Sequence, residues 1–326
     1  MKQLKIAAIG GGHGLSGMLR GLKQLTSDVT AIVTVADDGG GSGMLREDLG
    51  ILPPGDIREC ILALSNTEPT MEKLLHYRFT EGSLAGQSFG NLFLAAMNGI
   101  SSSFDEAVHK MGDVLAITGT VLPVTTSNVH LEAEFESGDR TIGESKIFYA
   151  KKINNSRIKQ IRLLPKDPPA LPETLEAIRR ADIIVIGPGS LYTSIIPNFL
   201  VQGVADAVAQ SNAMRIYVMN IMTQDGETEG YTAYEHIQAL LRHAPGCIDV
   251  CIANNEQIEQ ARLEPYRQEG LEPIRVERDK IEALGIELRE YPLVAGSRYI
   301  RHSSGRLAAA ILDVYSSRGG ISQSSR

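Results

Sequence analysis

The chain has 326 residues, of which 43% are hydrophobic and 22% charged, and its formal net charge is −7. These values are typical of a globular protein, and the length is sufficient for the core of a doubly wound α/β fold. The scattered Lys and Arg exclude a dominant nucleic-acid role. No apolar stretch approaches the ~20 residues that cross a bilayer, and the three cysteines and seven histidines show no metal-ligand spacing. We expect a cytoplasmic protein with no nucleic-acid partner, no membrane insertion and no metal site.

The beginning of the chain predicts half of a mononucleotide-binding unit. Residues 5–9 form an apolar strand that opens onto glycines, a helix begins near Leu15, and residues 30–35 form a second buried strand. Residues from about 56 to 111 carry mostly helical periodicity. This order of strand, glycine loop, helix and strand is typical of the Rossmann-like folds.

The middle of the chain changes to β character before the α/β alternation returns. Residues 129–135 alternate apolar and polar side chains, a turn follows, and residues 141–149 return as the second strand of a hairpin, with a further strand at 158–164. Strands are then predicted at 183–186, 215–219, 250–253 and 286–291, with a last helix at 303–315. We therefore predict an α/β fold: one Rossmann-like domain over residues 1–315 with a mostly parallel sheet. An inserted helical segment and small antiparallel hairpin region interrupt it at about 56–170, and residues 316–326 form a disordered tail.

A glycine-rich loop at residues 10–17 follows the first predicted strand. Glycines at a strand end let the backbone approach phosphate oxygens, and the N–H groups of the following helix point at the same anion. The predicted phosphate contacts are Gly11, Gly12, His13 and Gly14. The loop also matches the G-x-G-x-x-G dinucleotide fingerprint, with Asp37 as its ribose-binding acid, but the frame fits poorly because the strand ends at Gly10. A glycine turn without a ligand is the alternative.

A second glycine-rich loop, Ala36-Asp-Asp-Gly-Gly-Gly-Ser-Gly43, ends the second predicted strand. Adjacent carboxylates at a strand's carboxyl end suit ribose hydroxyls, a divalent cation or base chemistry, although Asp and Gly are also common in turns. Two such loops on neighbouring strands favour a site, to which we assign Asp37, Asp38, Gly40 and Ser42. Asp56 either caps the next helix or lines the rim of the same pocket.

Later segments place further polar residues at strand ends and helix starts. Residues 86–91 spell a G-x-S-x-G pattern, but no strand precedes it, so we do not interpret it as a nucleophile elbow. Residues 186–194 follow an apolar strand and suit a second phosphate or sugar contact. Arg301 lies beside a helix N-terminus, and Tyr266 either packs or stacks on a base. The predicted ligand contacts in these segments are Asn91, Gly187, Gly189, Ser190, Tyr192, Asn220, Tyr266 and Arg301.

Five motifs together resemble the bacterial gluconeogenesis factor (YvcK-like) family, which is related to 2-phospho-L-lactate transferase. They are Ile9-Gly-Gly-Gly-x-Gly-Leu-Ser, Thr34-Val-Ala-Asp-Asp-Gly-Gly, Pro54-Gly-Asp-Ile-Arg, Ile186-Gly-Pro-Gly-Ser-Leu-Tyr-Thr-Ser and Met222-Thr-Gln-x-Gly-Glu-Thr. The resemblance implies a Rossmann-like fold, a nucleotide-sugar ligand such as UDP-N-acetylglucosamine, and roles in gluconeogenic growth and cell shape. It places these residues in the nucleotide pocket: Gly11, Gly12, Asp37, Asp38, Asp56, Asn91, Gly189 and Ser190. It also implies that Tyr266 and Arg301 contact the sugar nucleotide.

Three functions stay open, and we rank them in the order given. The first is a non-catalytic regulatory protein that requires no cofactor, binds a UDP-sugar and signals to a protein partner in envelope synthesis. The second is a transferase of phosphorus-containing groups, using a GDP-linked donor, in which Asp37, Asp38 and Asp56 are the catalytic carboxylates and hold Mg²⁺ or deprotonate an acceptor. The third is an NAD-binding dehydrogenase, since NAD and UDP-sugars both present a pyrophosphate. For each we expect a homodimer.

Overall fold

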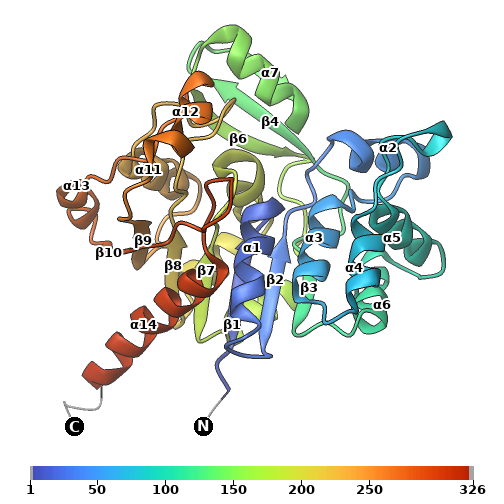
Figure 1. The fold of residues 1–326 in the computed structure, drawn as a ribbon, viewed down its shortest axis with the longest axis horizontal. Coiled ribbons are helices and arrows are strands. Elements are labelled where there is room, and N and C mark those ends of the chain that lie inside the picture. The colour runs from blue at the N-terminus through green and yellow to red at the C-terminus, as the bar shows by residue number, and fades with distance from the viewer. Residues whose placement is uncertain (1–2, 323–326) are drawn as a thin grey trace.

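A parallel β-sheet of seven strands forms the centre of the computed structural model, which describes residues 3–322 (Figure 1). The strands stand in the order β10-β9-β8-β7-β1-β2-β3, and all neighbouring pairs are parallel. Parallel strands covered on both faces are apolar along their whole length, as the buried run of β7 illustrates. The strands are β1 (Ile6–Gly10), β2 (Val29–Val33), β3 (Thr120–Pro123), β7 (Ile183–Ile186), β8 (Met214–Val218), β9 (Val250–Asn254) and β10 (Glu287–Tyr291).

Helices cover both faces of this sheet. On one face α1 (Gly12–Leu22) lies between α3 (Gly55–Leu64) and α14 (Ser304–Ser322), as Figure 1 shows. Parallel crossovers are right-handed, so the connection from β7 to β8, which runs the other way along the sheet, covers the opposite face. The other helices are α2 (Gly40–Leu49), α4 (Pro69–His76), α5 (Phe89–Gly99), α6 (Phe104–Val114), α8 (Pro172–Arg180), α9 (Ile196–Phe199), α10 (Val204–Ala209), α11 (Ala233–His243), α12 (Gln260–Gln268) and α13 (Arg278–Glu282).

Two groups of elements interrupt the alternation of strand and helix. The helices α2 to α6 separate β2 from β3, and β3, although it lies within the interval predicted as an insertion, is an edge strand of the main sheet. A three-stranded antiparallel sheet of order β5-β4-β6 then precedes β7, with α7 (Glu144–Asn154) between its last two strands in the chain. Its strands are β4 (His130–Phe135), β5 (Arg140–Ile142) and β6 (Ile158–Leu164).

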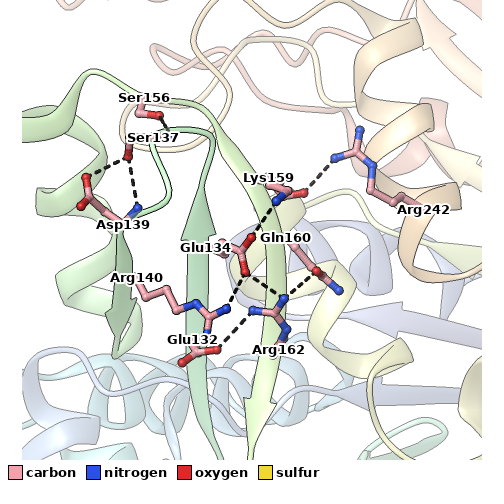
Figure 2. A network of polar contacts seen from close by, with 10 residues as sticks. All are labelled: Glu132, Glu134, Ser137, Asp139, Arg140, Ser156, Lys159, Gln160, Arg162 and Arg242. Carbon is pink, nitrogen blue, oxygen red and sulfur yellow. Dashed lines mark hydrogen bonds and ion pairs between the residues drawn. The ribbon is translucent and has the colours of Figure 1, made fainter.

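Charged side chains hold the small sheet together across its strands (Figure 2). One carboxylate, Glu134 of β4, lies 3.1 Å from Arg140, 2.8 Å from Lys159 and 2.9 Å from Arg162, and its side chain is 11% exposed. Hydrogen bonds from Lys159 and Arg162 lower the pKa of Glu134 to about 2. The carboxylate therefore stays ionised and links β5, β4 and β6.

Side chains of α11 occupy the free edge of β6. The Arg242 guanidinium donates to the carbonyl of Lys159 at 2.8 Å, and the Ile161 N–H donates to Nε2 of His243 at 3.1 Å. An exposed strand edge offers unpaired backbone groups to other chains. These two bonds satisfy part of that edge and fix the small sheet against the main domain.

The predicted α/β architecture with a small antiparallel sheet is confirmed, and three local predictions are wrong. Residues 141–149 are not a returning strand: β5 ends at Ile142 and α7 begins at Glu144, because Gly143 has a positive φ of 108° that breaks the strand. The first helix begins at Gly12 rather than near Leu15. The last helix continues to Ser322, so residues 316–322 are helical, while 323–326 lie outside the described residues. The division into domains stays a prediction.

Within residues 3–322, the structure contains no helix with both the length and the apolar composition needed to cross a membrane.

Candidate functional site

The carboxyl ends of β1 and β7 border the crevice where this topology places a ligand. The chain leaves β1 towards β2 and β3, returns to β7 on the other side of β1, and continues outward to β8. The point between two such strands, where the strand order reverses, is a topological switch point. The loops that leave the two strands there run to opposite faces of the sheet, which leaves a crevice outside the strand ends. The glycine loops at 10–14 and 187–190 meet there, so the structure brings two predicted loops together.

These two loops pack without room for a side chain. A Cβ on Gly14 would lie 2.4 Å from the carbonyl oxygen of Pro188, and one on Gly11 would lie 2.5 Å from Oδ2 of Asp56. The N-cap residue of α1, Gly11, has no side chain to cap the helix, and the N–H of Gly12 donates to the Asp56 carboxylate. The start of a helix beside close-packed glycine backbone suits an anion, and the exposed His13 side chain lies in the first turn of α1.

Side-chain amides hold both loops in position. Nδ2 of Asn198 donates to the carbonyl of Gly10 at 3.2 Å. Asn220, which follows β8, forms two hydrogen bonds with Gly189: its Nδ2 donates to the carbonyl at 2.7 Å, and its Oδ1 accepts the N–H at 3.1 Å. Nε2 of Gln224 donates to the Ser190 hydroxyl at 2.6 Å. Asn220 thus acts mainly by positioning the loop after β7.

The two aspartates after β2 have different environments. Asp37 accepts the N–H of Gly39 at 2.8 Å with one oxygen. Asp38 instead accepts both the N–H and the hydroxyl of Ser145, at 2.9 and 2.8 Å, at the start of α7. Asp38 therefore caps α7 from another part of the chain, and Asp37 is the carboxylate that faces the crevice.

The other predicted residues of this region lie at the starts of α2 and α3. Gly40 is exposed and begins α2, and the buried Ser42 hydroxyl accepts the N–H of Gly55 at 3.1 Å. Asp56 lies in the first turn of α3 without capping it, and its carboxylate accepts the N–H of Gly12. Ser42 therefore connects α2 to α3, and Asp56 connects α3 to the glycine loop at residues 10–14.

The helix α7 covers the crevice and is attached at both ends. Asp38 holds its first turn, while Lys151 and Lys152 form ion pairs with Glu229 at 2.9 Å and Asp225 at 2.5 Å. Beneath α7 lies a cavity of about 210 Å³, which we call the acidic cavity because its lining includes three carboxylates and no basic side chain. The lining residues are Asp37, Gly39, Glu144, Ser145, Phe148, Ser190, Thr193, Gln224 and Glu227.

Burial shifts the proton affinity of the carboxylates in and beside this cavity. Burial, and then the charge of Asp37, raise the pKa of Asp56 to about 7, against the hydrogen bond from Gly12. Burial raises the pKa of Glu227 to about 7, although the Thr193 hydroxyl and the Tyr192 N–H donate to it at 2.7 and 3.1 Å.

Glu144 is the most strongly perturbed of the group. Burial, and then its carboxylate neighbours Asp37, Asp56 and Glu227, raise the pKa of Glu144 well above its usual range. Within residues 3–322 none of these four side chains forms an ion pair. With a pKa of about 7, Asp56 and Glu227 accept protons near neutral pH.

Magnesium would fit this site only as an ion shared with a ligand. No group of three or more His, Cys, Asp and Glu side chains in the described part of the chain is placed to hold a metal. Protein Mg²⁺ is often held by one or two carboxylates together with substrate phosphates. Asp37 and Asp56, neighbours beside the Gly12 N–H, have the hard oxygen donors for that arrangement, in which the ion would neutralise phosphate charge.

A second cavity of about 420 Å³ lies at the carboxyl ends of β8 and β9. We call it the amide cavity because Asn and Gln side chains share its lining with aliphatic ones. The lining residues are Met219, Asn220, Ile221, Ala253, Asn254, Asn255, Glu256, Gln257, Ile258, Gln260, Pro273, Ile274 and Val276. Asn220, which holds Gly189, therefore also borders this cavity.

Tyr266 and Arg301 come together next to the loop after β8. The Tyr266 ring packs against Ile221 in a small hydrophobic cluster, and its hydroxyl accepts the N–H of Ile300 at 3.0 Å. Arg301 is exposed, with its guanidinium 5.5 Å from the ring centroid of Tyr299. Tyr266 thus fixes the residue before Arg301, and the guanidinium is left accessible.

Two other predicted contacts differ in their surroundings. The Tyr192 side chain is fully buried in the π-helical turn Leu191–Ile195, and its hydroxyl donates to the carbonyl of Ile158 at 3.1 Å, so this side chain is engaged within the protein and its ligand contact stays a prediction. Asn91 is buried at the start of α5, and its Oδ1 has no hydrogen bond within residues 3–322. Ser88 caps α5 with its hydroxyl and follows the 3-10 turn Gly82–Leu84 rather than a strand.

A larger cavity of about 700 Å³ lies at the opposite edge of the sheet. It is lined by residues of the amino ends of β1, β2 and β3 and by α8. None of the predicted site residues lies there, and in open α/β sheets ligands bind at the carboxyl ends. The crevice therefore defines the candidate site despite the smaller volumes of its two cavities.

Sequence reasoning missed two acidic residues of the site. Glu227 stands in one of the quoted motifs, and its buried carboxylate is visible only once the loop after β8 is placed against the π-helical turn. Glu144 carries no local signal, because its segment was predicted as a strand. Both reach the crevice through contacts between distant parts of the chain.

The topology and the crevice define a doubly wound α/β protein whose ligand site is built from glycine loops at the switch point. The family model described as 2-phospho-L-lactate transferase CofD matches residues 6–294. The chain belongs to this CofD family, which confirms the family suspected from the motifs.

Individual relatives match nearly the whole chain. It is 46% identical to the gluconeogenesis factor of Bacillus subtilis over 314 residues, which cover 95% of this chain and 98% of that protein. It is 45% identical to the gluconeogenesis factor of Halalkalibacterium halodurans over 316 residues, covering 96% and 97%. A crystal structure of a UPF0052-family protein from Bacillus halodurans superimposes with a TM-score of 0.92 at 45% identity, covering 96% of this chain and 99% of that one.

Proposed function

We propose that this protein binds a nucleotide-sugar, with UDP-N-acetylglucosamine as the first candidate, and acts as a regulatory factor in gluconeogenic growth and cell-shape maintenance. One observation carries the proposal: two glycine loops, held by Asn198 and Asn220, meet beside the N-terminus of α1 at the switch point. That arrangement suits a pyrophosphate. The gluconeogenesis factors named among the relatives support the physiological part of the proposal.

Isothermal titration calorimetry tests the proposal directly. The wild-type protein is expected to bind UDP-N-acetylglucosamine, and NAD is expected to compete with it only weakly. Substituting Asn220→Ala frees Gly189 and should lower the affinity about tenfold, the effect of losing a hydrogen bond that positions a phosphate contact. Asn212→Ala, at an exposed position, is the matched control and should bind as the wild type does. Absence of heat with millimolar UDP-sugar refutes the proposal.

A transferase of the 2-phospho-L-lactate type is the second candidate, and the carboxylates favour it. Asp56, whose pKa lies at about 7, has the proton affinity of a general base at neutral pH. The test supplies a GDP-linked phospholactate donor, a deazaflavin acceptor and Mg²⁺. Turnover that Asp56→Asn abolishes while ligand binding persists supports this candidate. No turnover with either Mg²⁺ or Mn²⁺ eliminates it.

The proposal extends to the setting of the protein. A UDP-sugar sensor works in the cytoplasm, where these nucleotides are made, and signals through a protein of envelope synthesis. We propose a homodimer as its assembly, since two-fold dimers are the commonest oligomers. Light scattering coupled to gel filtration checks this: a monomer mass at micromolar concentration contradicts it.

A further inference from the structure

We infer that a nucleotide-sugar binds across the crevice in one orientation, with its nucleoside in the amide cavity at the ends of β8 and β9. Its diphosphate then lies on the loops at 11–14 and 187–190, and its sugar enters the acidic cavity beneath α7. This inference rests on the proposed nucleotide binding and assigns a subsite to each part of the ligand. This orientation is the reverse of the one that the dinucleotide fingerprint implies, in which Asp37 after β2 would bind the ribose of the nucleoside.

The amide cavity has the size and chemistry of a nucleoside site. Its volume of about 420 Å³ lies within the ~300–1,000 Å³ that small-molecule pockets occupy. Ile221, Ile258 and Ile274 offer aliphatic surface for the faces of a base. The side-chain amides of Asn255 and Gln257 make no hydrogen bond within residues 3–322, and amides both donate to and accept from the edge of a base.

The amide cavity presents no free charge. Its one carboxylate, Glu256, lies 2.8 Å from the Arg306 guanidinium and also accepts the N–H of Val294 at 3.2 Å. Asn254 is likewise committed, because its Oδ1 accepts the N–H of Leu293 at 2.9 Å. A neutral base and its ribose can therefore enter without a charge being left unpaired.

The acidic cavity has the opposite character. Asp37, Glu144 and Glu227 line it without an ion pair in the described part of the chain. Carboxyl groups hydrogen-bond sugar hydroxyls in either protonation state, and they offer a phosphate no positive partner. The smaller volume of about 210 Å³ suits a single sugar ring better than a nucleoside.

Two consecutive residues connect the cavities. Gly189 is held by Asn220, whose side chain borders the amide cavity, and Ser190 lines the acidic cavity. A diphosphate over Gly189 and the start of α1 would therefore lead from one cavity to the other. The geometry leaves the nucleoside and the sugar on opposite sides of this loop.

Filling the amide cavity separates the two orientations. An Ile258→Trp variant is titrated with UDP-N-acetylglucosamine, UDP and inorganic pyrophosphate. Affinity for both uridine compounds should fall at least tenfold, while affinity for pyrophosphate changes by less than twofold. Ile100→Trp, the same change at a residue 72% exposed, is the matched control and should leave all three affinities unaltered.

The acidic cavity is tested with Glu144→Ala. This change removes the carboxyl group that would hydrogen-bond a sugar hydroxyl. Affinity for UDP-N-acetylglucosamine should fall about tenfold, as expected for a lost hydrogen bond, with less than twofold change for UDP.

Hydrogen exchange on the wild-type protein gives a readout that needs no variant. UDP should protect backbone amides of residues 254–260 and 274–276, and UDP-N-acetylglucosamine should add protection at 144–148. Protection of 144–148 by UDP alone overturns the inference, as does a wild-type affinity for UDP in the Ile258→Trp variant. Either result would contradict the orientation but not the proposed nucleotide binding. If the wild-type protein binds none of the three ligands, the proposed function fails and the inference falls with it.

Discussion

Glu227→Gln is expected to change how the stability of this protein depends on pH. The wild-type carboxyl has a pKa of about 7 in the folded protein against 4.5 as its ordinary value, because it is buried. The folded state therefore holds the proton more tightly than the unfolded state does, and stability falls as pH rises from about 4.5 to about 7. At ~1.4 kcal/mol per pKa unit, the loss is about 3 kcal/mol and is complete above the folded-state pKa.

The glutamine removes this dependence at the expense of one hydrogen bond. Its oxygen still accepts from the Thr193 hydroxyl, but its NH₂ group faces the Tyr192 N–H, another donor. Losing that bond costs about 1 kcal/mol at every pH. The variant should thus be less stable than the wild type below about pH 5 and more stable by about 2 kcal/mol above about pH 7.5, the two curves crossing between about pH 5 and 6.

Urea unfolding between pH 4.5 and 8.5 measures the difference. Glu264→Gln, at an exposed position of α12, serves as the control and should give a difference that does not vary with pH. A constant difference between the Glu227→Gln variant and the wild type over this range would refute the assignment of the buried, protonated carboxyl.

Two further predictions concern the loops around the crevice. Gly14→Ala should lower the free energy of unfolding by about 2–4 kcal/mol, because the added Cβ would meet the Pro188 carbonyl oxygen at 2.4 Å. Gly17→Ala, where nothing lies within 4 Å, should be neutral or stabilising; equal melting temperatures for the two variants would contradict the close packing. Asp38→Ala should cost about 1–2 kcal/mol and increase hydrogen exchange at the start of α7, since Asp38 caps Ser145. Asp38→Asn keeps the accepting oxygen and should restore most of the protection. If Asp38→Asn instead exchanges as fast as Asp38→Ala, the protection depends on the charge of Asp38 and not on its hydrogen bonds.

The main sheet and its glycine loops were predictable because their signals are local. A strand buried on both faces is apolar throughout, as in β7, and a glycine run directly after a strand marks a place where backbone must approach something closely. Gly11 and Gly14 do so, against Asp56 and Pro188. Each inference needed only a few consecutive residues.

The position of α7 over the site was not predictable, because contacts between distant residues create it. The segment that forms α7 follows a turn and is predicted from its sequence as the second strand of a hairpin, yet the carboxylate that caps the helix, Asp38, lies 107 residues away from Ser145 in the chain. The pKa of Glu144 likewise depends on carboxylates from three other segments. No pattern within residues 141–149 contains that information.

The amide groups of Asn198 and Asn220 have a kinetic consequence. They already hold the loops at 10–14 and 187–190 in one arrangement, so little conformational entropy remains to be lost when phosphates arrive. The helix α7 covers the acidic cavity and is attached by Asp38 and by the ion pairs of Lys151 and Lys152. The association rate of a ligand would then depend on the preformed loops, and its residence time on the hydrogen bonds and ion pairs that hold α7.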